Sequence, residues 1–137
     1  MADAIRVKTD PDPLERYRLA QGYRIGDLVV LSGQAALDDE GNVVGAGDFD
    51  AQAEQVFRNL QKVLAAADSS LEQVVKVTIY LTDMSYFPRI VELRGKWFKP
   101  PYPADTIVEV SRLGLPELMI EIEAIALTRD GRIIDAG

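Results

Sequence analysis

The chain has 137 residues, of which 47% are hydrophobic, and its formal charge is -7 from 22 acidic and 15 basic residues. This length and the even composition predict one globular domain over residues 1–137, with a core large enough to fold unaided. The excess of negative charge argues against a nucleic-acid partner, because the surface as a whole repels phosphates. The sequence contains no cysteine and no histidine, which excludes disulfides, thiolate nucleophiles and the commonest transition-metal ligand.

The N-terminal part is expected to be irregular as far as Gly22. Its first residues, "MADAIRVKTDPDP", are polar and interrupted by prolines, which predicts an arm with at most one short strand. They lack the basic and then apolar pattern of a secretion signal, and nowhere do about 18 apolar residues follow one another. A soluble cytoplasmic protein with no membrane partner is therefore predicted. Residues 27–37 are rich in β-formers, and with Val43 and Val44 they indicate a strand and a β-hairpin.

The rest of the chain alternates between strands and amphipathic helices. Asp50 is expected to cap the first helix, in which apolar residues recur at helical spacing. Pro88 is compatible with the first turn of the second helix. The predicted elements are a helix at 51–67, a strand at 72–84, a helix at 85–98, strands at 105–112 and 119–127, and a final turn at "RDGR".

Two helices can cover only one face of such a sheet, so the other face requires a partner. Alternation assigns a purely apolar set to the helix side: Val75, Val77, Ile79, Leu81, Thr106, Val108, Val110, Ile120, Ile122, Ala124 and Ala126. The other set is mixed: Lys76, Thr78, Tyr80, Asp105, Ile107, Glu109, Ser111, Met119, Glu121, Glu123, Ile125 and Leu127. Apolar residues rimmed by charges usually mark an interface, which predicts subunits that pack sheet to sheet.

Glu121 and Glu123 are the first candidates for chemistry, since both project from the mixed face. A carboxylate half-buried at an interface has a raised pKa and suits general acid or base catalysis. The alternative is an ion pair with Lys or Arg, which is the commoner role. Ser32 and Gly33 end a strand, where a glycine lets backbone N–H groups approach a ligand or forms an ordinary bulge. No histidine exists to activate Ser32, and the acids of "LDDEGN" lack the spacing of a calcium loop, so no metal site is predicted.

Four segments together resemble the RidA (YjgF-type) family of enamine and imine deaminases: "LVVLSGQ", "AQAEQVFRNLQKVLAAADSSLEQVVKVTIYLTDM", "YPADTIVEV" and "IEIEAIAL". They are similar in order and spacing, from about Gly22 to Leu127. The resemblance implies an α+β, chorismate-mutase-like fold with a mixed sheet packed by two helices. It also implies a homotrimer with a central β-barrel and three clefts between subunits that bind a small molecule. The deaminases of the family use no cofactor and hydrolyse reactive imines to a keto acid and ammonia.

The resemblance also suggests roles for single residues. Glu121 matches the acid that orients water, and is the expected catalytic residue. Ser32 and Gly33 match the strand end that lines the cleft. The remaining expected cleft residues are Ile107, where many members have a cysteine whose backbone carbonyl positions water, Val91, at a position that is often asparagine, and Tyr17 or Leu19, near a position that is often tyrosine.

Asp105 departs from the family pattern. In the deaminases the segment equivalent to "PAD" is Pro-Ala-Arg, and the arginine holds the substrate carboxylate through two hydrogen bonds. Asp105 repels a carboxylate, which predicts a substrate other than a simple 2-imino acid. With Glu121 it would make the cleft anionic and suited to a cationic or neutral amine, imine or enamine. A nearby Lys or Arg would instead make Asp105 structural, and Arg18, Arg24, Arg94 or Arg112 could supply a guanidinium from another direction.

A second hypothesis is a non-catalytic trimer of the same fold that binds a small molecule or another protein. Ribonuclease activity, a third, is disfavoured by the charge and the lack of histidine. The leading hypothesis is a cofactor-independent, RidA-like hydrolase acting on reactive imines, enamines or related amines.

Overall fold

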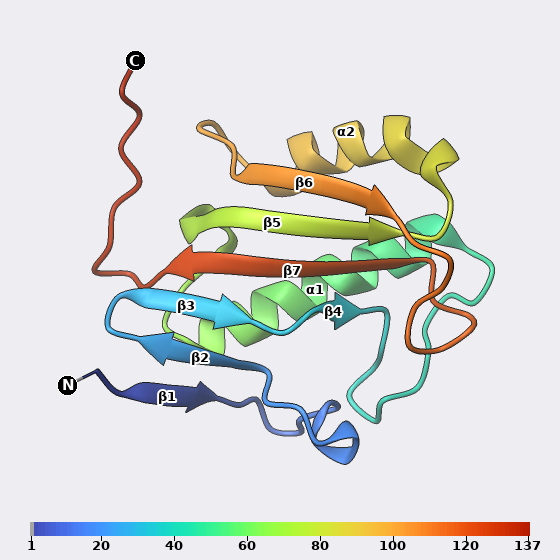
Figure 1. Ribbon diagram of the computed structural model, residues 1–137, viewed down its shortest axis with the longest axis horizontal. Coiled ribbons are helices and arrows are strands. Elements are labelled where there is room, and N and C mark those ends of the chain that lie inside the picture. Colours follow the sequence, from blue (N-terminus) through green and yellow to red (C-terminus); the bar gives the residue numbers. More distant parts are fainter. Residues whose placement is uncertain (1) are drawn as a thin grey trace.

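One mixed β-sheet with two α-helices makes up the computed structural model, which describes residues 2–137 (Figure 1). The strands lie in the order β1-β2-β3-β7-β5-β6, and β4 also pairs with β7. Only the β5–β6 pair is parallel among these strands. Their bounds are β1 Ala4–Val7, β2 Gly22–Ile25, β3 Leu28–Leu31, β4 Gln34–Ala35, β5 Val74–Leu81, β6 Ala104–Glu109 and β7 Ile120–Leu127. The α+β fold class predicted from the sequence is confirmed.

Helix α1 (Phe49–Ala66) and helix α2 (Phe87–Trp97) lie behind the sheet in Figure 1, with α2 next to β6. The buried residues of α1 recur every three or four positions, as an amphipathic helix requires: Phe49, Gln52, Ala53, Val56, Phe57, Leu60, Val63 and Leu64. They pack on Val77, Ile79, Ile120 and Ile122 to form the core. Burial of this one helix face is what holds the helices to the sheet.

The cap of α1 differs from the prediction. Asp48, not Asp50, is the N-cap: its backbone is extended and its carboxylate accepts the Ala51 amide at 3.1 Å. Asp50 lies in the first turn and pairs with Arg89 at 2.7 Å. Both acids are favourable residues at a helix N-terminus. Because the helix starts earlier than predicted, Phe49 is its first residue and is buried.

The second helix and the N-terminal arm agree with the predictions. Pro88 lies in the first turn of α2, which follows a short 3₁₀ turn at Met84–Tyr86. Two further 3₁₀ turns lie at Glu15–Tyr17 and Leu71–Gln73. The expected hairpin at Val43 is reduced to one bridge with Leu37. Within residues 2–137, neither helix is long and apolar enough to cross a bilayer.

The start of strand β5 is irregular, so Val75, which was predicted to lie in the core, does not do so. The pairing with β7 slips between Val74 and Lys76. Val74 is consequently buried on the helix side and Val75 is half-buried. From Val77 onward the expected alternation holds.

Strand β6 presents the opposite faces from those predicted. Its parallel register places Asp105 beside Val77 and Ile107 beside Ile79, so both lie on the helix side. Thr106 shares the open face, where its hydroxyl accepts a hydrogen bond from Lys76 at 2.6 Å. The two acids of β6 can lie on the helix side because each has a hydrogen-bonding partner there. Asp105 pairs with Arg94, and Glu109 accepts the Met84 amide at 2.8 Å.

The open face of the sheet carries a patch of exposed apolar side chains next to the glutamates of β7. The cross-strand pairs Tyr23–Val30, Ile25–Leu28 and Val30–Ile125 place them side by side. We call Tyr23, Ile25, Leu28 and Ile125 the open-face patch; each is at least 36% exposed. Such a patch is typical of a surface that meets another chain.

Candidate functional site

Glu121 is the second residue of β7 and lies between strands β4 and β5. It pairs with Ala35 on one side and with Tyr80 on the other. These pairs place its half-buried side chain on the open face of the sheet, as alternation along β7 predicted.

Gly33 allows Glu121 to lie against the chain between β3 and β4. A Cβ atom at Gly33 would be 2.8 Å from the carboxyl carbon of Glu121, closer than real Cβ atoms come. A side chain at position 33 would therefore displace the Glu121 carboxylate from this position, so the glycine does more than form a bulge.

Ser32, beside Gly33, has a structural partner. Its hydroxyl donates to the Ala20 carbonyl at 2.6 Å, and its amide donates to the Gln21 carbonyl at 2.9 Å. These bonds join the end of β3 to the segment before β2. The Ser32 hydroxyl hydrogen is therefore already engaged and does not point to a ligand.

A cavity of about 200 Å³ lies in front of Glu121 and Gly33. Tyr17 and Leu19, the two alternatives for one position, both line it. Arg16 fixes the Tyr17 ring by donating to its hydroxyl at 2.8 Å. The other lining residues are Leu14, Ala35, Leu37, Gly114, Leu115 and Leu118, so Glu121 is the one ionisable carboxylate in a mostly apolar cavity. We call it the Glu121 cavity.

Burial raises the pKa of Glu121 above its ordinary value of 4.5, and the charge of Glu123 raises it further. Tyr80 donates a short hydrogen bond to Glu123. This bond is also the main cause of a raised pKa for Tyr80, because ionisation would break it. Tyr80 therefore fixes Glu123, whereas Glu121 has no hydrogen-bond partner from the protein among residues 2–137.

Asp105 lies elsewhere and is held by α2. Arg94 donates to it twice, from Nε to Oδ2 at 2.8 Å and from Nη2 to Oδ1 at 2.9 Å. The Asp105 side chain is 18% exposed and that of Arg94 25%. Both oxygens of Asp105 are thus engaged by a guanidinium, which contradicts the expectation of an unpaired acid that recognises a cation.

A second cavity, of about 440 Å³, adjoins this ion pair. Val91, one of the predicted cleft residues, lines it with Asp105 and Arg94. Its remaining lining residues are Gly95, Phe98, Tyr102 and Pro103. Ile107 does not line it; this half-buried side chain packs against the core on the same face of β6 as Asp105. We call this second cavity the Arg94 cavity.

The predicted residues therefore fall into two groups that one chain does not bring together. Tyr17, Gly33 and Glu121 line the Glu121 cavity at the start of β7, and Ser32 precedes Gly33 in the chain without lining it. Asp105 lies beside Val77 of β5, whose side chain is on the helix side, whereas Glu121 lies beside Tyr80 of β5, whose side chain is on the open side. Val91, Asp105 and Ile107 accordingly belong to the other face of the sheet.

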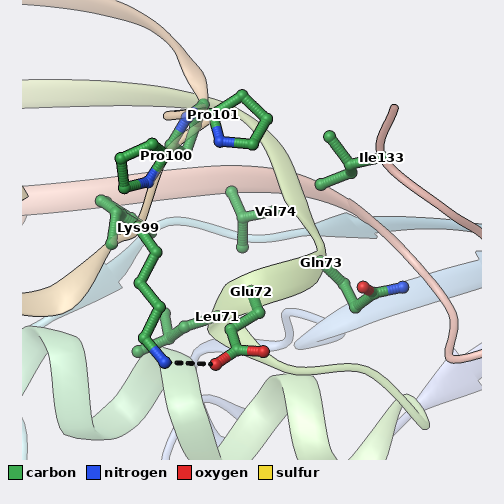
Figure 2. Close-up of a pocket in the computed structure, with 10 residues that line it drawn as sticks. Leu71, Glu72, Gln73, Val74, Lys99, Pro100, Pro101 and Ile133 are labelled. Atoms are coloured by element: carbon green, nitrogen blue, oxygen red, sulfur yellow. Dashed lines mark hydrogen bonds and ion pairs between the residues drawn. The ribbon is translucent and has the colours of Figure 1, made fainter. Parts of the chain in front are cut away.

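A third cavity contains none of the predicted residues. Figure 2 shows it between the loop at Pro100 and Pro101 and the C-terminal segment at Ile133. Lys99 and Glu72 form an ion pair at its edge at 3.0 Å, and both side chains are largely exposed. An ion pair open to water in this way contributes little to ligand affinity. In the described part of the chain, residues 2–137, no three acidic side chains gather closely enough to hold a metal ion.

Sequence reasoning missed the importance of Arg94 and of the aromatic residues Phe98 and Tyr102. Arg94 is one of the four arginines that could supply a guanidinium to the cleft, and its position in a helix gives no signal of where its side chain points. The pairing with Asp105 depends on α2 packing next to β6. That contact is tertiary and cannot be read from alternation along either element.

Comparison with known proteins agrees with this fold. The family model described as endoribonuclease L-PSP matches residues 7–128. A RutC family protein of Pyrococcus horikoshii is 37% identical over 92% of this chain and 98% of its own. The crystal structure of RidA from an Antarctic Psychrobacter species is 36% identical, covers 89% of this chain and 98% of its own, and has a TM-score of 0.81. The chain belongs to the RidA (YjgF-type) family.

Other RidA-family relatives carry names that describe an activity. A protein of Dermatophagoides farinae, 32% identical over 85% of this chain and 89% of its own, is named a 2-iminobutanoate/2-iminopropanoate deaminase. Some RidA-family relatives of this chain are thus imine deaminases. The family resemblance predicted from the four sequence segments is confirmed.

Proposed function

We propose that this protein is a cofactor-independent hydrolase of reactive imines or enamines that works in clefts between the subunits of a homotrimer. The observation that carries the proposal is Glu121, a half-buried carboxylate with a raised pKa that faces an apolar cavity. A carboxylate of this kind is suited to take a proton from water and to return it.

Glu121 acts on the water molecule in this proposal. The substrate enters as the protonated imine, and the Glu121 carboxylate accepts a proton from water as the water oxygen bonds to the imine carbon. The electrons of the C=N bond move to nitrogen, which becomes the amine of a neutral tetrahedral carbinolamine. The protonated Glu121 then gives its proton to that nitrogen. The C–N bond breaks, ammonia leaves, and the remaining hydroxyl becomes a carbonyl as it passes its proton back to the Glu121 carboxylate. Water is the only co-reactant, so the sequence of steps needs no cofactor.

Assembly supplies the rest of the cleft. The Glu121 cavity and the Arg94 cavity lie on different faces of one chain, and the open-face patch offers an apolar surface on the same face of the sheet as Glu121. In a ring of subunits, every chain presents one surface to each neighbour. We propose that the Glu121 cavity of one subunit faces the Arg94 cavity of the next, so that Val91 and Asp105 join Tyr17, Gly33 and Glu121.

The substrate is proposed to differ from simple 2-imino acids. The resemblance implies an arginine at position 105 in the deaminases, and Asp105 cannot donate hydrogen bonds to a carboxylate. Its own charge is balanced by Arg94, so the cleft does not require a cationic substrate either. Imines and enamines with larger apolar substituents fit the lining of Val91, Phe98 and Tyr102 better than short ones.

The test is a screen of imines generated in place from amino acids by an amino-acid oxidase, with release of ammonia or loss of the imine measured against the uncatalysed rate. We expect accelerated hydrolysis of imines with branched or aromatic side chains, and at least about tenfold lower kcat/KM for 2-iminopropanoate, since each missing methylene costs about 1–3 kcal/mol in such a cavity. No acceleration of any imine, with ligand binding retained, would favour the non-catalytic binding protein. Fastest hydrolysis of 2-iminopropanoate would contradict the role given to Asp105.

A further inference from the structure

The ion pair between Arg94 and Asp105 uses only part of the guanidinium. A guanidinium has five N–H donors, and Asp105 accepts from the edge formed by Nε and Nη2. The other edge, formed by Nη1 and the second N–H of Nη2, has no acceptor from the protein within residues 2–137. Arg94 therefore retains one planar pair of donors.

The orientation of Arg94 is fixed before any ligand binds. Two hydrogen bonds to Asp105 set the plane of the guanidinium, and the ring of Phe87 lies 5.8 Å from its central carbon. An arginine held in this way loses little conformational freedom when a ligand binds. Asp105 is thus a positioning residue, which acts through Arg94.

The surroundings of Arg94 determine the rest of the ligand. Apart from the ion pair, the Arg94 cavity is lined by Val91, Gly95, Phe98, Tyr102 and Pro103. Apolar walls around a single oriented pair of donors are suited to a ligand with an apolar body and two coplanar acceptor oxygens. A carboxylate offers two such oxygens and lies closer to the guanidinium than to Asp105 when it binds the free edge.

We propose that the free edge of Arg94 binds the carboxylate of a substrate whose apolar side chain lies against Phe98 and Tyr102. This inference rests on the proposed function and names its substrate class: imines or enamines of carboxylic acids with branched or aromatic side chains. Arg94 approaches the ligand from helix α2, and the specificity for a long side chain comes from the cavity beside it.

Binding of stable 2-oxo acids tests the proposal without any turnover. We expect 4-methyl-2-oxopentanoate to bind the protein, as followed by calorimetry, and Arg94→Met to weaken it about 10- to 100-fold, the range for a hydrogen bond to a charged group. Arg94→Lys keeps a cation opposite Asp105 and protects the fold, but lacks the planar edge, so it should also weaken binding. The matched control is Arg89→Met, which removes an arginine of the same helix that pairs with Asp50 and Glu92 away from this cavity.

A neutral ketone of the same shape, 4-methyl-2-pentanone, separates the carboxylate from the cavity walls. We expect its weaker binding to be unchanged by Arg94→Met. Equal loss of both ligands, or full affinity of both Arg94 variants for the oxo acid, would overturn the proposal. If the oxo acid binds through Arg94 but no imine is hydrolysed, the inference holds and the proposed hydrolase fails. If imines are hydrolysed equally well by wild type and both Arg94 variants, the hydrolase holds and the inference fails.

Discussion

Replacing Glu121 by glutamine is expected to reduce kcat/KM for imine hydrolysis by about 10²- to 10⁴-fold, the usual contribution of a general acid or base. Glutamine keeps the size and the hydrogen-bonding atoms of the side chain but cannot take or return a proton. The space at Gly33 also accommodates the glutamine side chain, because glutamine and glutamate differ only in one terminal atom. The measurement is steady-state hydrolysis of the best imine from the screen.

The pH dependence identifies the group. Burial raises the pKa of Glu121 above 4.5, so the carboxylate forms at higher pH than an ordinary glutamate. The acid side of the wild-type kcat/KM profile should therefore rise at a pH above 4.5, and this limb should be absent from Glu121→Gln. A profile with the same limb in both proteins would assign the proton transfer to another group.

Stability provides the control for folding. An unfolded glutamate ionises near 4.5 and the folded Glu121 only at higher pH, so the folded state binds more protons in that interval. The free energy of unfolding therefore falls as pH rises through the interval, and the penalty persists at pH 7. Glu121→Gln should be at least as stable as wild type at pH 7. Glu54→Gln, which alters an exposed ion pair with Arg58, should leave turnover unchanged.

Introducing a charge into the open-face patch is expected to dissociate the proposed homotrimer. Ile125→Asp places a carboxylate beside Glu123, on the face proposed to meet other subunits. Burying an unpaired charge costs several kcal/mol per ion, and a trimer repeats that cost in each subunit. The variant should sediment as a monomer of 15.1 kDa and hydrolyse no imine, because the cleft needs two chains.

Ile134→Asp is the matched control for that variant. Ile134 is 74% exposed but lies in the C-terminal segment, away from the open-face patch. It should remain a trimer with wild-type turnover. A trimeric Ile125→Asp, or a monomeric one that keeps full activity, would show that this face does not build the site.

The sequence predicted most of the fold because the long elements carry strong periodicity. Strand β7 and the later part of β5 face the core as their alternation requires, and the apolar residues of α1 mark its buried side. The prediction of which face of strand β6 is buried was wrong for a physical reason. Both of its residue sets contain apolar side chains, and the choice of face was made by the register with β5 and by partners for Asp105 and Glu109.

The candidate site was harder to predict than the fold. Glu121 and Gly33 could be found because they are neighbours across β7 and the end of β3, within recognisable segments. Arg94 could not, since its meaning depends on which strand lies under α2. In the sequence, Asp105 takes the place of a binding arginine and carries the opposite charge, which predicted a role in ligand recognition. The structure instead pairs it with Arg94, eleven residues earlier in the chain.

The central claim is that each cleft combines the Glu121 cavity of one subunit with the Arg94 cavity of another, and mixed trimers test it most directly. Glu121→Gln inactivates the first half. Gly95→Trp blocks the second, since a Cβ at Gly95 meets nothing within 4 Å and the ring would extend into the Arg94 cavity. When the two inactive proteins are unfolded together and refolded as an equal mixture, each mixed trimer has one cleft with neither change. We expect recovery of roughly one quarter of wild-type turnover, whereas a mixture as inactive as its components would contradict a cleft shared by two subunits.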